Sequence, residues 1–112
     1  MIETIVYQYM DGALDVPCYM MRPENNVPAE YVLIEKTGGS EQDFLKRSTF
    51  AFQSYAQTLA RAAEINEAVK EAAADLITLP EVSGSQYSTD YNFTNTATKQ
   101  PRYQAVYDVY HY

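Results

Sequence analysis

One long amphipathic segment, from about Gln57 to Leu79, constrains the fold more than any other feature of the sequence. Its apolar residues recur at the three- and four-residue spacing of a helix, and Pro80 ends the pattern. Glu67 and Lys70 are placed to pair on its polar side. Seven alanines between Ala60 and Ala74 give the helix a small face that can lie close against a sheet. An oligomer interface is the less common use of such a face, and the sequence leaves it open.

The rest of the chain carries mostly strand patterns. Phe50 and Phe52 alternate with other residues, which predicts that both point to one face of a strand. The last stretch has apolar residues on both faces, so we expect it either in the middle of a sheet or in contact with a neighbour on its second face. Gly38-Gly39 predicts the end of one strand, followed by a polar connection over Ser40–Lys46. The predicted strands are Val16–Pro23, at an edge because of its prolines, Tyr31–Lys36, Ser48–Tyr55, Tyr87–Phe93 and Tyr103–Tyr112.

At the N-terminus a single apolar stripe runs from Ile2 to Met10, which predicts a short helix. Asp11-Gly12 is expected to stop this helix, with Gly12 in a left-handed conformation. We therefore predict an α+β fold in a single domain over residues 1–112. It has an antiparallel or mixed sheet of four to five strands, with the short N-terminal helix and one long central helix packed on one face.

Charge and cysteine content exclude several classes of function. The 112-residue chain (12.7 kDa) has 15 acidic and 8 basic side chains and a net charge of −7. A protein that binds nucleic acid or an anionic membrane would need a basic face. One cysteine makes neither an intramolecular disulfide nor a thiolate zinc site. No apolar run is long enough to span a bilayer, and we expect no signal peptide, no cofactor and no metal.

Few residues could carry catalysis, and we predict that the protein is not an enzyme. His111, the only histidine, is next to the last residue, where we expect a partly exposed aromatic rather than part of a triad. Cys18 sits among large apolar residues, so a buried and inert thiol is expected. Gly38-Gly39-Ser40 lacks the lysine that follows in a phosphate-binding loop. The acidic residues near it lack the spacing of a calcium loop.

With its elements in this order, the chain resembles the tail terminator (tail-completion) proteins of long-tailed bacteriophages, including the lambda-type terminator. No single segment is a strict motif; the resemblance lies in the ordered set and covers most of the chain. The segments that carry it are the short N-terminal helix, Val16–Tyr19, Tyr31–Gly39, Ser48–Ala56 leading into the alanine-rich helix, and Pro101–Val109.

This resemblance implies a structural virion protein, assembled in the cytoplasm of the bacterial host. Six copies would form a ring on the last ring of the tail tube and stop tube polymerisation. The other side of the ring would dock to the head–tail connector or neck protein. DNA would pass through the lumen without specific binding, because a negative wall does not attract phosphates.

Two sets of residues are candidates within this interpretation. Loops carry contacts in many proteins. Interface candidates therefore come from the two polar connections and from the last strand: Gly38, Gly39, Glu41, Asp43, Lys99, Arg102, Tyr103 and Tyr107. Some acidic side chains are expected to line or rim the pore, and the candidates are Glu35, Glu41, Asp43, Asp90 and Asp108.

Three other interpretations stay open. One is a different neck component, a head-completion or connector protein of similar design. Another is a small inhibitor or immunity-type module whose acidic surface mimics nucleic acid, which would be a monomer or dimer. The third is a small α+β enzyme, which would need a pocket with convergent polar groups.

Overall fold

In the computed structural model, which describes residues 1–112, the long amphipathic segment forms helix α2 (Leu59–Ala74). Thr58 caps its N-terminus, because the hydroxyl accepts a hydrogen bond from the Arg61 N–H at 3.2 Å. A short 3-10 helix, η1 (Asp75–Thr78), continues it to just before Pro80. The buried side chains of α2 include Ala62, Ile65, Val69, Ala72 and Ala73, so part of the alanine-rich segment faces the core as predicted. Leu59, Ala60, Ala68 and Ala74 are exposed.

Helix α1 (Ile2–Ala13) packs beside α2 and buries Ile2, Val6 and Met10. The helix ends at Ala13, one residue beyond the predicted stop at Asp11-Gly12, but the expected left-handed conformation of Gly12 is wrong, because Gly12 has no positive φ. The Asp11 side chain has a different role: its Oδ1 accepts a hydrogen bond from the Cys18 N–H at 3.0 Å. That bond ties the end of α1 to the first strand.

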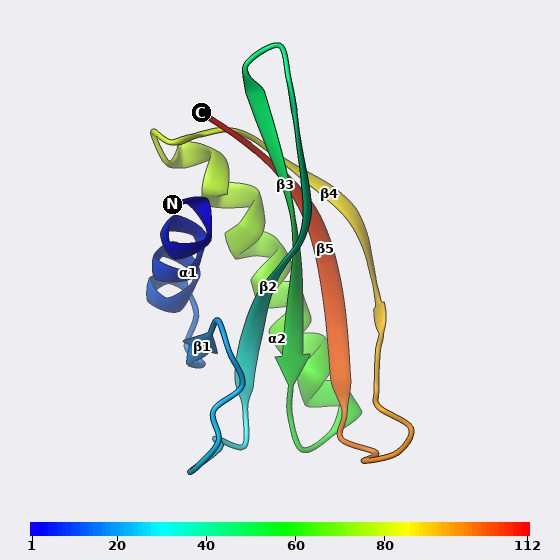
Figure 1. Cartoon of the computed structure of the whole chain (residues 1–112). Coiled ribbons are helices and arrows are strands. Elements are labelled where there is room, and N and C mark those ends of the chain that lie inside the picture. Colours follow the sequence, from blue (N-terminus) through cyan, green and yellow to red (C-terminus); the bar gives the residue numbers. More distant parts are fainter.

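The sheet has five strands in the order β1-β2-β3-β5-β4, and only the β1–β2 pair is parallel. Both helices cover the same face (Figure 1). The predicted α+β class is therefore confirmed, as are the edge position of the first strand and the central position of the last. The bounds are β1 Cys18–Tyr19, β2 Tyr31–Gln42, β3 Leu45–Tyr55, β4 Val82–Asn92 and β5 Arg102–His111.

The core lies between this face of the sheet and the two helices. Phe50 and Phe52 point into it from β3, as their alternation predicts. Tyr107 of β5 lies against them, with its ring 6.1 Å from that of Phe52. The small alanines of α2 let the helix approach these aromatic rings closely.

The strand that begins at Tyr31 does not end at Gly38-Gly39, and this prediction is wrong. β2 continues to Gln42 and pairs with β3 up to Leu45, so the predicted polar connection is the end of a hairpin. Both glycines have negative φ and extend the strand. Gly39 fits a close approach of the two strands, because a Cβ there would make a tight contact, 3.2 Å from the carbonyl oxygen of Arg47.

We call residues 38–47 the arm. Lys46 and Arg47 still pair with β5, and the end of the hairpin beyond them projects past the other strands (Figure 1). The whole chain measures 43 × 24 × 24 Å. Strand β4 also begins earlier than predicted, at Val82 rather than Tyr87, because Val82 is buried in the core.

None of the helices combines the length and apolar character needed to cross a bilayer.

Candidate functional site

The face of the sheet opposite the helices, which we call the open face, carries a chain of hydrogen bonds across three strands. Tyr55 donates its hydroxyl to Gln53 Oε1 at 3.0 Å, and Gln53 Nε2 donates to Gln104 Oε1 at 2.9 Å. Gln104 Nε2 then donates to the Tyr91 hydroxyl at 2.6 Å. Such a connected network fixes the side chains on β3, β5 and β4 in one arrangement.

An aromatic cluster extends this fixed surface toward β1. The rings of Tyr31 and Tyr55 stack at 4.5 Å, and Tyr19 meets Tyr31 edge-on at 5.9 Å. Burial raises the pKa of the Tyr31 hydroxyl. Arg102 lies over the Phe93 ring at 4.3 Å and donates from Nη1 to the Tyr55 hydroxyl at 2.9 Å. The open face at this end of the molecule is therefore preorganised.

Both outer edges of the sheet are free over most of their length. β4 is the last strand on one side, and its whole outer edge has no partner strand. On the other side β1 pairs only with Val32 and Leu33 of β2, so the edge of β2 beyond Leu33 is also unpaired. Edges of this kind accept another strand, and natural proteins usually block them with proline, lysine or a covering segment. β4 contains neither proline nor lysine.

The arm ends in a two-residue loop, Asp43-Phe44, between the paired residues Gln42 and Leu45. Both loop residues have positive φ, 52° and 67°, which is the pattern of a type I′ hairpin turn. Glycine is the preferred residue at such positions, and a phenylalanine there is strained. The Phe44 side chain is 95% exposed, so nothing in the same chain compensates for that strain.

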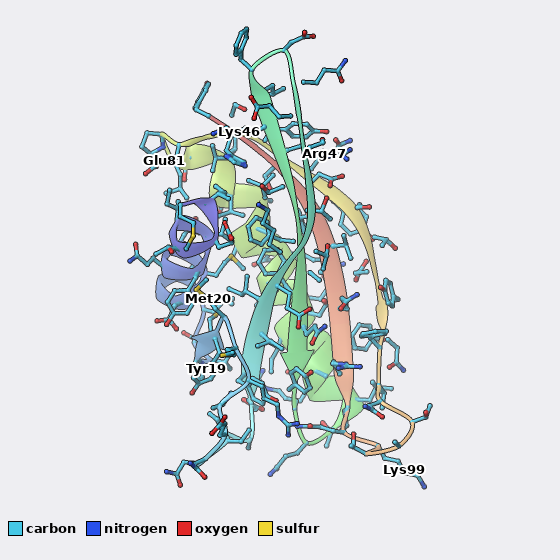
Figure 2. All side chains as sticks on the ribbon, in the orientation of Figure 1. Tyr19, Met20, Lys46, Arg47, Glu81 and Lys99 are labelled. Carbon is cyan, nitrogen blue, oxygen red and sulfur yellow. The ribbon has the colours of Figure 1, made fainter.

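Two adjoining hollows lie at the base of the arm. One, of about 530 Å³, is lined only by polar residues and glycines, among them Lys36, Lys46 and Arg47. The other, of about 770 Å³, adds the apolar side chains of Met1, Ile2, Ile5 and Pro80. Lys36, Lys46 and His111 line both hollows. Figure 2 shows Lys46 at the same end of the molecule as Glu81, which lines the second hollow.

His111 and Ser48 form a buried pair at the floor of the polar hollow. The Ser48 hydroxyl is 2.8 Å from His111 Nε2, and Nδ1 is 3.3 Å from the carbonyl oxygen of Tyr112. The expectation of a partly exposed histidine is wrong, because His111 is only 8% exposed. A serine next to a histidine is the arrangement of a nucleophile and its base. Here no carboxylate orients the imidazole, and Ser48 is 2% exposed, so its Oγ is not presented to a substrate.

Cys18 is a buried thiol, as its apolar surroundings predict. Desolvation, with a smaller contribution from Asp11, raises the pKa of this thiol to about 12. The thiolate that nucleophilic or metal chemistry needs is therefore suppressed. No group of three or more histidine, cysteine, aspartate or glutamate side chains is arranged to hold a metal ion.

The interface candidates fall in three different environments. Gly38, Gly39, Glu41 and Asp43 lie on the exposed arm, and Lys99 is exposed in the loop between β4 and β5. Arg102 is held within its own sheet and is half-buried like Tyr103. The choice of Tyr107 is wrong: its ring is in the core, 4% exposed, with its hydroxyl donating to the carbonyl oxygen of Lys70 at 3.2 Å.

The five acidic candidates do not share one face of the sheet. Glu35, Glu41 and Asp43 are exposed, and Asp108 accepts a hydrogen bond from Thr49 on the open face at 2.7 Å. Asp90 faces α2, where Lys70 Nζ lies 3.1 Å away and Asn66 donates at 2.8 Å.

The environment of Asp90 is that of a structural carboxylate. A hydrogen bond from the Tyr87 hydroxyl, then those from Lys70 and Asn66, hold the pKa of Asp90 below its usual value against the opposing effect of burial. Lys70 also pairs with Glu67 at 3.0 Å, as the helical spacing predicts. Asp90 therefore joins β4 to α2 and is occupied within the protomer.

Sequence reasoning missed the arm and the Ser48–His111 pair. The arm has a readable signal, since Glu41 and Lys46 are opposite charges placed symmetrically about Asp43-Phe44, as cross-strand partners are. The Ser48–His111 pair has no such signal in the sequence, because it joins residues 63 positions apart in the chain.

No protein-family model matches the chain, and no curated protein sequence matches it.

Proposed function

We propose that this protein is an assembly component that closes into a ring of identical copies and serves as a tail terminator of a long-tailed bacteriophage. The observation that carries the proposal is the pair of free sheet edges, on β2 and β4, at opposite sides of one rigid sheet. A surface that offers two different complementary edges associates head to tail, and such contacts close into rings when the rotation between copies permits.

The strand directions suit this contact. Each step from β2 through β3 and β5 to β4 is antiparallel, so β2 and β4 run in opposite directions. A rotation that sets copies side by side brings β4 of one copy antiparallel to β2 of the next. The ladder then continues from copy to copy, and backbone groups that are unpaired in the monomer gain partners.

The ring accounts for the proposed biological role. Six copies sit on the last ring of the tail tube and stop its growth, while the opposite side of the ring docks to the head–tail connector. DNA passes through the lumen during ejection. The net charge of −7 per copy supports passage without adhesion, because phosphate binding requires clustered lysine and arginine on the wall.

An enzyme is the less well supported function. The hollows at the base of the arm contain polar groups, yet the only serine–histidine pair there is buried and lacks an orienting carboxylate. The cysteine is buried and its pKa is raised. The features that are exposed and unusual, the edges and the arm, are those of a protein that binds other protein chains.

Co-sedimentation with purified tail tubes tests the proposal. A terminator binds tube ends, whereas a connector binds DNA-filled heads first, and an inhibitor-like module binds neither.

The variant Ser88→Pro tests the contact between sheet edges. Ser88 lies at the β4 bulge where the pairing with β5 shifts, and a proline there should weaken ring formation by blocking the outer edge of β4. Ser88→Ala keeps the backbone N–H and is the matched control. Thermal unfolding of both variants as monomers shows whether the fold is retained. Failure of the wild-type chain to bind tube ends would contradict the proposal.

A further inference from the structure

The end of the arm combines two costs that a stable monomer would avoid. Phe44 holds a positive φ that favours glycine, and its aromatic ring is almost entirely in solvent. Leu45, next to it, is also an exposed apolar residue. A strained residue and an exposed aromatic ring at the same position indicate a contact that forms outside the protomer.

The larger hollow at the base of the arm is the complement of this tip. Its apolar lining comes from Met1, Ile2, Ile5 and Pro80, and its volume is about 770 Å³. Lys36 and Lys46 line it, while Glu81 is its one acidic side chain. Neither lysine has a carboxylate within ion-pair distance in the protomer.

The tip has the opposite character. Phe44 and Leu45 are apolar, and Asp43 beside them is acidic and makes no ion pair in the protomer. Glu41 is already opposite Lys46 in the hairpin. Apolar groups thus meet apolar groups, and the Asp43 carboxylate meets the ammonium groups of the lysines. In a chain with a net charge of −7, most of the surface repels a second copy, so this basic hollow is a favourable place for an acidic segment of that copy.

The tip does not fill the hollow of its own chain. Lys46, which lines the hollow, is only two residues from Phe44, yet Phe44 is 95% exposed and does not line the hollow. We infer that Phe44 and Asp43 of one copy dock in the hollow formed by Lys36, Lys46 and the start of α1 in a second copy. This inference rests on the proposed function only in requiring a second copy, and it names a contact separate from the sheet edges.

Sedimentation velocity over a range of protein concentrations measures the contact. Phe44→Ala should weaken self-association by about 30-fold or more, as expected for an aromatic anchor in a central pocket. Leu59→Ala is the matched control, because it removes another exposed apolar side chain at the start of α2. The control should associate like the wild type.

Charge exchange identifies the occupant. Asp43→Lys alone and Lys36→Glu alone should each weaken association by about tenfold, and the two changes in one chain should restore it to within about threefold of wild type. Glu24→Lys, in the exposed connection between β1 and β2, is the charge control and should have no such effect.

The outcomes separate this inference from the proposed function. If wild-type protein associates and neither the arm variants nor the Lys36 variant changes the association, the arm contact is wrong and the ring proposal stands. Two single variants that weaken association without recovery in the combined chain would show that the tip and the hollow bind different partners, and would overturn the pairing. A wild-type chain that remains monomeric at all concentrations, alone and with tail tubes, overturns both proposals.

Discussion

Replacing Phe44 with glycine should stabilise the isolated protomer. A non-glycine residue in the left-handed region costs roughly 1–2 kcal/mol, and Phe44 has a φ of 67° there. Glycine adds about 0.5–1 kcal/mol of chain entropy to the unfolded state, which offsets part of the relief. The Phe44 ring is 95% exposed, so its removal loses little buried surface. The expected net gain is about 0.5–1 kcal/mol, or roughly 2–5 °C in Tm for a domain of this size.

Thermal and urea unfolding at low protein concentration measure this gain, because association would otherwise stabilise the wild type through its assembly contacts. Phe44→Ala separates the effect of backbone strain from the effect of losing the ring. Alanine also lacks the ring but keeps the Cβ that strains a positive φ, so the free energy of unfolding should stay within about 0.5 kcal/mol of wild type. A glycine variant that is no more stable than the alanine variant would show that the positive φ at this position is not strained, and would refute the reasoning.

Three further measurements test the interior. Cys18 should resist alkylation at pH 8 in the folded protein and react on unfolding, as followed by mass spectrometry. The pKa of Asp90 is lowered in the folded protein, so the ionised carboxylate stabilises the fold fully above its unfolded pKa of ~3.9. This stabilisation is lost as the pH falls through the folded pKa. Asp90→Asn should therefore make the free energy of unfolding depend less on pH in the acidic range. Gln104→Leu should cost about 1–2 kcal/mol in urea unfolding by leaving Gln53 and Tyr91 unpaired.

The parts of the fold that could be predicted are those whose sequence period repeats over several turns or residues. The alanine-rich helix, the inward direction of Phe50 and Phe52 and the central place of the last strand all follow from such periods. Each of these elements buries one face or both faces, and a buried face requires apolar residues at regular intervals in the sequence.

The failed predictions of element ends depended on single residues that were taken as signals to stop. Gly38-Gly39 and Gly12 were expected to end elements, yet all three have ordinary φ values and continue them. Gly39 is explained by the close approach of the Arg47 backbone, which is a property of the paired strand. Alternation alone could not show which face of the sheet Tyr107 is on, because its strand has apolar residues on both faces. The packing of α2 decides which of these faces is buried in the core.

The candidate site could be predicted only in part. The acidic and glycine residues near position 40 draw attention to the segment that forms the arm, but not to its length or to its strained tip. The hollow at its base is assembled from α1, the arm, the turn before β4 and the end of β5. Contacts between segments so distant in sequence leave no local pattern to read.

Native mass spectrometry of the purified chain, with negative-stain images of the same sample alone and on tail tubes, tests the central claim most directly. We expect a species of six times the 12.7 kDa chain mass and a ring with an open centre, at least at the ends of the tubes. A species that stays at the mass of one chain under all of these conditions, with bare tube ends, would contradict the account.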